Sequence, residues 1–353
     1  MPPRLNLFPR TSFDVLGFTP YQGFGFRPCE TGLQPKRFSR GVDAQNASPP
    51  DSCTDWFTGL LSMEEKKRLK RFKRERNAFP GMRIQPRDIE ILKSLADYRF
   101  LDTVQIMALH PGGERNIRRR LQKLFHNGFI DRLGQQLSYT RPLGHMIYAL
   151  ANKGADLLAE HFADFERTKV DWMTKNRETK ERYIFHRLMI SNFRTVLTLA
   201  LKNTHQAKLA SWRQGRDLKD YVKLDGQRVA VVPDAFFTLE DPQSRMHFFL
   251  EADQSTMTRG RFLKKMKAYW QWWKQGGQEK KFDIKSFRVL TICKSEARKE
   301  NLRQTAKDAD DYKKGSLMFW FTSENEIGLS NANRILEPIW QTPASDKYHY
   351  ILE

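Results

Sequence analysis

The sequence predicts an α/β fold, α+β overall, in which a small helical domain precedes a larger domain built on a β-sheet. Three observations support this prediction. Apolar residues recur with helical spacing between residues 85 and 160, a longer helical pattern covers residues 177–203, and two apolar runs flank a turn-rich hexapeptide within residues 229–256. The length of 353 residues leaves room for two domains of this kind.

The composition favours an anionic partner. The chain holds 61 Lys and Arg against 41 Asp and Glu, a formal net charge of +20, and this excess favours nucleic acid or another anionic surface. No run of about 18 uncharged apolar residues occurs, so the sequence predicts no transmembrane helix. Residues 1–10 lack the apolar core of a secretory signal. Cys29, Cys53 and Cys293 show no metal-ligand spacing and fit reduced thiols in the cytoplasm.

The start of the chain predicts a tail and a basic arm. Residues 1–62 are rich in Pro, Gly and Ser without a helical or strand period, so we expect a disordered tail. Because no methionine lies between Met1 and Met63, a start codon assigned too far upstream would explain this tail, and a functional arm is the alternative. The arm, residues 63–84, includes EEKKRLKRFKRER with eight basic side chains among thirteen. It is either a solvated face or a phosphate-gripping arm.

Residues 85–160 contain a compact series of elements. Helical patterns cover residues 86–98, 102–110 and 114–128, two short strands follow in 129–134 and 146–154, and a further helix covers 155–162. The order helix, helix, basic helix, β-hairpin, helix is that of a winged helix-turn-helix, in which the third helix enters the major groove. A winged helix that docks on protein is the alternative.

The third of these helices has two distinct faces. Its apolar residues recur at i, i+4, i+7 and i+8, as Ile117, Leu121, Leu124 and Phe125. Basic and amide side chains occupy the other positions, and we expect them to contact DNA bases and phosphates. The predicted DNA-binding residues are Arg115, Asn116, Arg118, Arg119, Gln122 and Lys123.

Residues 161–177 form a polar connector, and a second domain is expected over residues 178–353. It opens with the long helical pattern, in which His186 stands among apolar residues. A lone histidine on such a face is most simply a hydrogen-bonded core residue. A short strand is expected in 207–214 and a helix in 259–275, with Lys265 beside an aromatic stripe. Its stripe residues are Phe262, Met266, Tyr269, Trp270 and Trp273.

The two apolar runs, residues 229–239 and 246–254, predict a β-hairpin across the turn-rich sequence EDPQSR. They carry Asp234, Glu251 and Asp253, which are costly in apolar strands unless they are paired, hydrogen-bonded or bound to a cation. If the strands pair antiparallel, Asp234 lies near Glu251, and two carboxylates suit Mg²⁺. The alternative is a set of strand-end acids that face solvent or pair with Arg or Lys.

Further along, a strand is expected in 286–295, a helix in 299–312 and a last strand in 316–323.

This order, helix, three strands, helix, strand, helix and strand, resembles the core of the PD-(D/E)XK nuclease superfamily. The resemblance implies a restriction-endonuclease-like α/β domain with a central mixed sheet. Pro233-Asp234 matches the PD motif and Glu251-Ala252-Asp253 matches the third motif, although Asp253 stands where the motif has lysine. Lys265 on the following helix is the candidate substitute. The resemblance implies Mg²⁺ held by Asp234, Glu251 and Asp253, and catalysis by Asp234, Glu251 and Lys265 if the domain is active.

More narrowly, three segments resemble the replication-relaxation family of bacterial plasmids and other mobile elements. They are FHRLMISNFRTVL, which contains His186 and Asn192, VVPDAFF, and FFLEADQSTMTRGRFLKKMKAY, all after the expected winged helix. The resemblance covers residues 85–275. It implies a cytoplasmic protein of bacteria that acts in DNA replication, relaxation or mobilisation.

Three functions follow from these patterns. The first is a DNA-binding protein of a mobile element whose nuclease-like domain need not be active, since the fold is often reused without activity. The second is an active Mg²⁺-dependent DNA endonuclease, and the third is a transcriptional or copy-number regulator. The expected partners are double-stranded DNA, a relaxase or replication protein, and a second copy of the chain, with no membrane.

Overall fold

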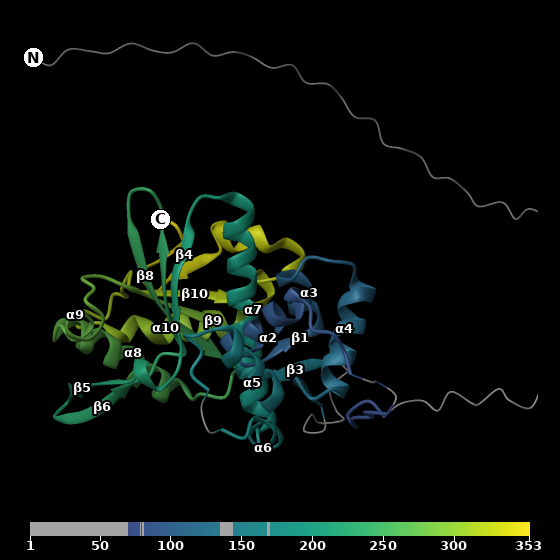
Figure 1. Ribbon diagram of the computed structural model, residues 1–353. Helices are drawn as coiled ribbons and strands as arrows, with labels where there is room; N and C mark the ends of the chain where they lie inside the picture. Colours follow the sequence, from purple (N-terminus) through teal and green to yellow (C-terminus); the bar gives the residue numbers. More distant parts are fainter. Residues whose placement is uncertain (1–69, 78, 80, 135–143, 168–169) are drawn as a thin grey trace, which may run out of the picture. The chain divides into compact units, whose positions relative to one another are not determined.

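The computed structural model describes residues 70–77, 79, 81–134, 144–167 and 170–353 (Figure 1). The predicted tail and residues 63–69 of the predicted basic arm lie outside the described residues. So do residues 135–143, which connect the two strands predicted in the first domain.

The N-terminal part of the described chain combines helices with a small antiparallel sheet, in the strand order β1-β3-β2. Its elements are α2 (Pro86–Tyr98), β1 (Leu101–Asp102), α3 (Thr103–Leu109), α4 (Glu114–His126), β2 (Ile130–Leu133), β3 (Ile147–Leu150) and α5 (Asn152–His161). The helices and the two longer strands lie where the sequence predicted them, and the two-residue strand β1 is an addition.

Local capping and apolar spacing explain these helices. Asp102 caps α3 by accepting a hydrogen bond from the Gln105 backbone nitrogen at 2.8 Å. Proline begins α2, where its missing N–H has no helical partner in any case. One pair of side chains ties α2 to α4: Asp88 is fully buried and forms an ion pair with Arg120, whose Nε donates to Asp88 at 2.9 Å. Arg120 therefore supports the fold.

Part of the predicted basic arm packs against this domain. Arg74 Nε donates to the Phe125 carbonyl oxygen at 2.9 Å, and its Nη2 pairs with Asp131. Phe79 stacks on His126 with ring centroids 4.0 Å apart. Over these residues the arm is a structural strap, and Arg74 faces inward.

A short helix and a long helix lead into the second domain. Within the predicted polar connector, Asp171 caps α6 (Trp172–Arg177) by accepting hydrogen bonds from two backbone nitrogens. The long helix α7 (Glu181–Thr204) ends at His205, which adopts a left-handed backbone conformation with φ 55°.

The second domain is built on a seven-stranded mixed sheet in the order β12-β11-β10-β9-β8-β7-β4. Strands β8, β9 and β10 are parallel, and the other neighbours are antiparallel. The strands of this sheet are β4 (Lys208–Arg213), β7 (Ala235–Glu240), β8 (Arg245–Asp253), β9 (Arg288–Cys293), β10 (Phe319–Ser323), β11 (Trp340–Thr342) and β12 (Ser345–His349). This is the mixed α/β architecture that the sequence predicted.

Helices cover both faces of the sheet. The helices on the two faces are α7 and the 3₁₀ segment Leu329–Leu336 on one side, and α8 (Arg259–Lys274) and α10 (Glu296–Ala306) on the other. Strand alternation sorts the side chains: Phe237 and Phe248 pack toward α7, whereas Phe236 and Phe249 pack toward α8. A shorter helix, α9 (Gly277–Phe282), follows α8.

Three predicted features of this domain are wrong. The apolar run 229–239 is two strands, because β6 (Gln227–Val231) pairs with β5 (Asp220–Leu224) in a separate two-stranded sheet and β7 begins only at Ala235. Residues 316–323 do not form the last strand, since β11 and β12 follow. In α8 the buried tryptophan is Trp272, while Trp273 is 39% exposed.

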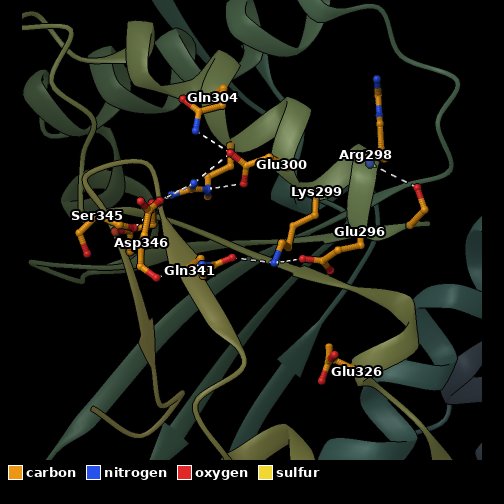
Figure 2. Close-up of polar contacts among 12 residues, drawn as sticks. Glu296, Arg298, Lys299, Glu300, Gln304, Glu326, Gln341, Ser345 and Asp346 are labelled. Carbon is orange, nitrogen blue, oxygen red and sulfur yellow. Dashed lines mark hydrogen bonds and ion pairs between the residues drawn. The ribbon is translucent and has the colours of Figure 1, made fainter.

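Two buried cations on α10, Lys299 and Arg303, attach the β11–β12 hairpin, and Figure 2 shows Lys299 between Gln341 and Glu296. Lys299 Nζ donates to Gln341 Oε1 at 2.6 Å and pairs with Glu296. Arg303 pairs with Glu300 and with Asp346, at 2.9 and 2.6 Å, and its Nη1 also donates to two backbone carbonyls of the hairpin. Both cations are less than 5% exposed, so their partners are needed to offset the loss of hydration.

Candidate functional site

The predicted acids lie at one end of the sheet, where β7 begins and β8 ends. The Asp234 backbone nitrogen donates to the Leu250 carbonyl oxygen at 3.0 Å, which extends the β7–β8 pairing by one residue. Because Ala235 pairs with Leu250, Asp234 stands opposite Glu251. The structure therefore brings Asp234 and Glu251 together, as the antiparallel pairing predicted.

Asp234 is held by α7 and by the neighbouring strand. His186 Nε2 lies 2.9 Å from Asp234 Oδ1, and the Ala252 backbone nitrogen donates to Oδ2 at 2.9 Å. Burial by itself would lower the pKa of His186, but the hydrogen bond and charge of Asp234 outweigh it and raise that pKa. Burial opposes ionisation of Asp234 as well, and the contact with His186 nevertheless lowers its pKa. His186 is thus a member of this site and not an ordinary core histidine.

Glu251 is held by α8. Lys265 Nζ pairs with Glu251 Oε2, and the Tyr269 hydroxyl donates to Oε1 at 2.6 Å. Burial raises the pKa of Glu251 to about 7, with Lys265 lowering it and Asp234 raising it. Burial would lower the pKa of Lys265, but Glu251 and Asp234 together raise it. The candidate lysine therefore contacts the predicted acid from the helix that follows it.

Asp253 does not join this pair. Arg298 of α10 holds it with two parallel hydrogen bonds, Nε to Oδ2 at 2.7 Å and Nη2 to Oδ1 at 3.0 Å. Two-point pairing of this kind is the strongest ordinary arrangement of guanidinium and carboxylate. Arg298 Nη2 also donates to the Met257 carbonyl oxygen at 2.6 Å. Asp253 therefore connects β8 to α10.

The three acids are thus paired one to one with His186, Lys265 and Arg298, which come from three different helices. Every carboxylate oxygen of the three acids accepts at least one hydrogen bond. Across the part of the chain that the structure describes, no group of three or more His, Cys, Asp and Glu is placed to hold a metal ion. The predicted Mg²⁺ set therefore does not fit this arrangement, because Asp253 is committed to Arg298 and the other two acids have cationic partners.

Asn192 lies in a neighbouring cavity of about 360 Å³. Its Nδ2 donates to the Ile327 carbonyl oxygen at 2.9 Å. The cavity is bounded by Gln254, Lys294 and Glu324, which follow the parallel strands β8, β9 and β10. Burial raises the pKa of Glu324, and the charge of Lys294 lowers it in part. Asn192 thus belongs to this cavity and is not among the partners of the acids.

The residues predicted to bind DNA form the outer face of α4. Its inner face is buried and apolar, while Arg115, Asn116, Arg118 and Arg119 are exposed. Gln122 and Lys123 are half-buried. Arg118 Nε donates to Glu114 at 2.7 Å on the surface of the same helix.

Further basic residues lie beside this face, and of these Arg132 and His145 were not predicted to bind DNA. Together with Arg118 of α4 and Arg71 of the basic arm, they line a cavity of about 330 Å³. Arg132 Nη1 donates to the Arg71 carbonyl oxygen at 3.0 Å, so the strap supports this wall. The run of basic residues in the arm was the sequence signal for Arg71. The contact between Arg71 and Arg132 of β2 forms only in the folded chain, so the sequence did not indicate it.

The comparison with protein families decides which family these segments represent. A sequence model of the replication-relaxation family matches residues 92–284, more than half of the 353-residue chain. The chain belongs to the replication-relaxation family. No curated protein matches it.

This replication-relaxation protein also shows a distant likeness to two solved structures of the restriction endonuclease FokI, one of them bound to DNA. Each is 13% identical, with TM-scores of 0.26 and 0.25. The matches cover 70% of this chain and 43% and 44% of the FokI chains, so the chain spans less than half the length of that endonuclease.

The matched region includes α4, His186, Asp234, Glu251 and Lys265, so the family model covers both candidate sites. Membership of the replication-relaxation family supports a DNA-related role. Among the helices that the structure describes, none is long and apolar enough to cross a membrane.

Proposed function

We propose that this replication-relaxation protein binds double-stranded DNA through the outer face of α4, in the replication, relaxation or mobilisation of a plasmid or other mobile element. The observation that carries the proposal is the separation of the two faces of α4. Ile117, Leu121 and Leu124 are fully buried, whereas Arg115, Arg118 and Arg119 are exposed. A helix held by its apolar face with arginine and asparagine facing outward suits the major groove, as in a winged helix.

The nuclease-like domain acts in this proposal as a binding module. The support is the pairing of Asp234, Glu251 and Asp253 with His186, Lys265 and Arg298, which offsets the charge of the acids within the protein. Acids that repel phosphate are thereby made compatible with DNA nearby. A relaxase or replication protein, and a second copy of the chain, are the proposed protein partners in the bacterial cytoplasm.

The test compares two charge-matched triple variants of the full chain. Arg115→Ala/Arg119→Ala/Lys123→Ala removes three cations from α4, and Lys202→Ala/Lys285→Ala/Lys347→Ala removes three exposed lysines elsewhere. Fluorescence anisotropy with duplex DNA should show a large loss of affinity for the first variant only. Its slope of log affinity against log salt should fall by about 0.9 for each lost phosphate contact. Equal behaviour of the two variants would contradict the role of α4.

One observation favours a second function, a Mg²⁺-dependent DNA endonuclease: Asp234, Glu251 and Lys265 lie together as the nuclease resemblance implies, although a metal would have to displace the pairs that Asp234 and Glu251 form with His186 and Lys265. Supercoiled, linear and single-stranded DNA should be incubated with the protein, with and without Mg²⁺ or Mn²⁺. Nicking that is lost in Asp234→Asn and in Lys265→Ala would establish cleavage. DNA that stays uncleaved under every condition would contradict the endonuclease function, and DNA binding would remain the proposed function.

A further inference from the structure

The two-stranded sheet β5–β6 is inserted between β4 and β7, immediately before the site acids. Its turn consists of Asp225 and Gly226, both with positive φ (49° and 78°). Two such residues form the tight turn that matches the twist of paired strands. From β6 the chain passes through Val232 and Pro233 to Asp234, so this ribbon leads directly to the nuclease-like site.

The inner face of the ribbon is firmly attached to α8 (Figure 1). Val222 and Val231 are buried in the same hydrophobic cluster as the apolar side of α8. Trp272 Nε1 donates to Asp220 at 2.8 Å, and Gln275 Nε2 donates to the Lys223 carbonyl oxygen at 3.0 Å. The ribbon is therefore held in place by side chains of α8 rather than by its own two strands alone.

The outer face is cationic. Lys223 and Arg228 are exposed and directly opposite each other in the strand register. Tyr221 is 42% exposed, with the Arg228 guanidinium 3.8 Å and the Lys219 ammonium 4.9 Å from its ring centre. The strand positions on this face carry no acid, because Tyr221 is opposite Ala230.

This arrangement is unfavourable for the isolated protein. Like charges directly opposite across two strands destabilise a sheet, and here Lys223 faces Arg228 without an acid between them. An anion at this face would remove the repulsion. A phosphate group would also find a hydrogen-bond donor in the Tyr221 hydroxyl and a planar set of donors in Arg228.

We propose that the outer face of β5–β6 is a second DNA-contacting surface, which grips the phosphate backbone of duplex DNA beside the nuclease-like site. This inference rests on the proposed function, because it assumes that the protein binds DNA. Duplex DNA is the chosen partner because a two-stranded ribbon fits the major groove, where phosphates flank it on both sides. Tyr221, Lys223 and Arg228 are the contacting residues.

The experiment uses variants of the full chain that separate binding from folding. Lys223→Ala/Arg228→Ala removes the opposed cations, and Lys202→Ala/Lys347→Ala removes two exposed lysines on α7 and β12. Lys223→Glu places a cross-strand ion pair in the ribbon. Melting temperature and duplex affinity over a salt series are measured for each.

We expect the ribbon double variant to bind duplex DNA at least about tenfold more weakly, with a salt slope lower by about 1.8 for two phosphate contacts. Its melting temperature should be equal to or above that of wild type, because a repulsion has gone. Lys223→Glu should be more stable still and should bind DNA more weakly than wild type. The control should bind like wild type.

The outcomes distinguish this inference from the proposed function. If the α4 triple variant loses affinity while both ribbon variants bind like wild type, the ribbon inference is overturned and the proposed function stands. If the ribbon variants lose affinity while the α4 variant does not, the ribbon is the DNA surface and α4 is not. A wild-type protein that binds no duplex DNA overturns both.

Discussion

Lys265 of α8 pairs with Glu251 of β8, so the helix after the strand supplies a cation to the acid of that strand. The two side chains are 20% and 7% exposed. Glu251 also lies opposite Asp234, and their mutual repulsion adds to the cost of its burial. The ammonium group of Lys265 on Glu251, together with His186 on Asp234, therefore allows the two acids to share this end of the sheet.

Removal of Lys265 should be costly. Lys265→Met leaves Glu251 buried without its cation, and breaking a buried pair from one side typically costs about 3–5 kcal/mol. The double variant Lys265→Met/Glu251→Gln should recover part of this loss, because no unpaired charge remains. Denaturant unfolding of the two single variants and the double variant measures the coupling. Strictly additive losses would show that the two groups do not interact.

The stability of the domain should fall as pH rises from about 4.5 to about 7. The folded pKa of Glu251 is about 7, against an ordinary value of 4.5, so the folded chain binds more protons than the unfolded chain in this range. The raised pKa of His186 acts in the same direction, since its contribution is complete below the unfolded value and is lost as pH rises through the folded value.

Glu251→Gln isolates the glutamate part of this dependence. The difference between the folded pKa of Glu251, about 7, and its ordinary value of 4.5 corresponds to roughly 3 kcal/mol of unfolding free energy between these two pH values. The variant cannot titrate, so its unfolding free energy should vary less between these pH values than that of wild type. Identical pH profiles for the two proteins would show that Glu251 ionises normally.

Divalent cations should leave the melting temperature unchanged. The carboxylate oxygens of Asp234 and Glu251 already accept hydrogen bonds from four different groups, and two of these groups are cationic side chains. A ligand at a hundred times its dissociation constant would stabilise the fold by about 2.7 kcal/mol, which a melting curve detects. Melting curves in Mg²⁺, Ca²⁺ and a chelator provide the comparison. A melting temperature that rises with metal in wild type but not in Asp234→Asn would show that these acids bind the metal.

Two adjacent arginines of α4 should behave differently. Arg120 pairs with the fully buried Asp88, so Arg120→Ala should lower the unfolding free energy by about 3 kcal/mol or more. Arg119 is exposed, and Arg119→Ala should change it by less than about 0.5 kcal/mol. Chemical denaturation checks both, and each variant serves as the control for the other. Similar losses would mean that Arg119 also supports the fold.

The N-terminal elements were predictable because their signals are local. Ile117, Leu121 and Leu124 mark the buried face of α4 by spacing alone, and the opposite face follows from it. The β5–β6 ribbon could also have been predicted from the sequence, since Asp225-Gly226 between two short alternating runs is a strong hairpin signal. It was missed because the run from Val229 to Leu239 looks like one apolar strand, although Pro233 interrupts it.

The partners of the acids were not predictable in the same way. Asp253 and Arg298 are 45 residues apart, and only the parallel arrangement of β8 and β9 with α10 brings them together. Trp272 rather than Trp273 is buried because the ribbon, absent from the prediction, provides a hydrogen-bond acceptor for its indole at Asp220. Lys265 was found through the resemblance to the nuclease superfamily, in which the lysine can come from the helix that follows the strand of the acid.

The attachment of the β11–β12 hairpin to α10 has a consequence for the order in which the chain folds during synthesis. Until β11 and β12 have left the ribosome, Lys299 lacks Gln341 and Arg303 lacks Asp346. The sheet domain therefore cannot close over these two cations until this hairpin has been synthesised. The helical part that contains α4 needs no such late partner and can fold first, as N-terminal domains generally do. During synthesis the helix that we propose to bind DNA would thus be ready before the sheet domain has formed.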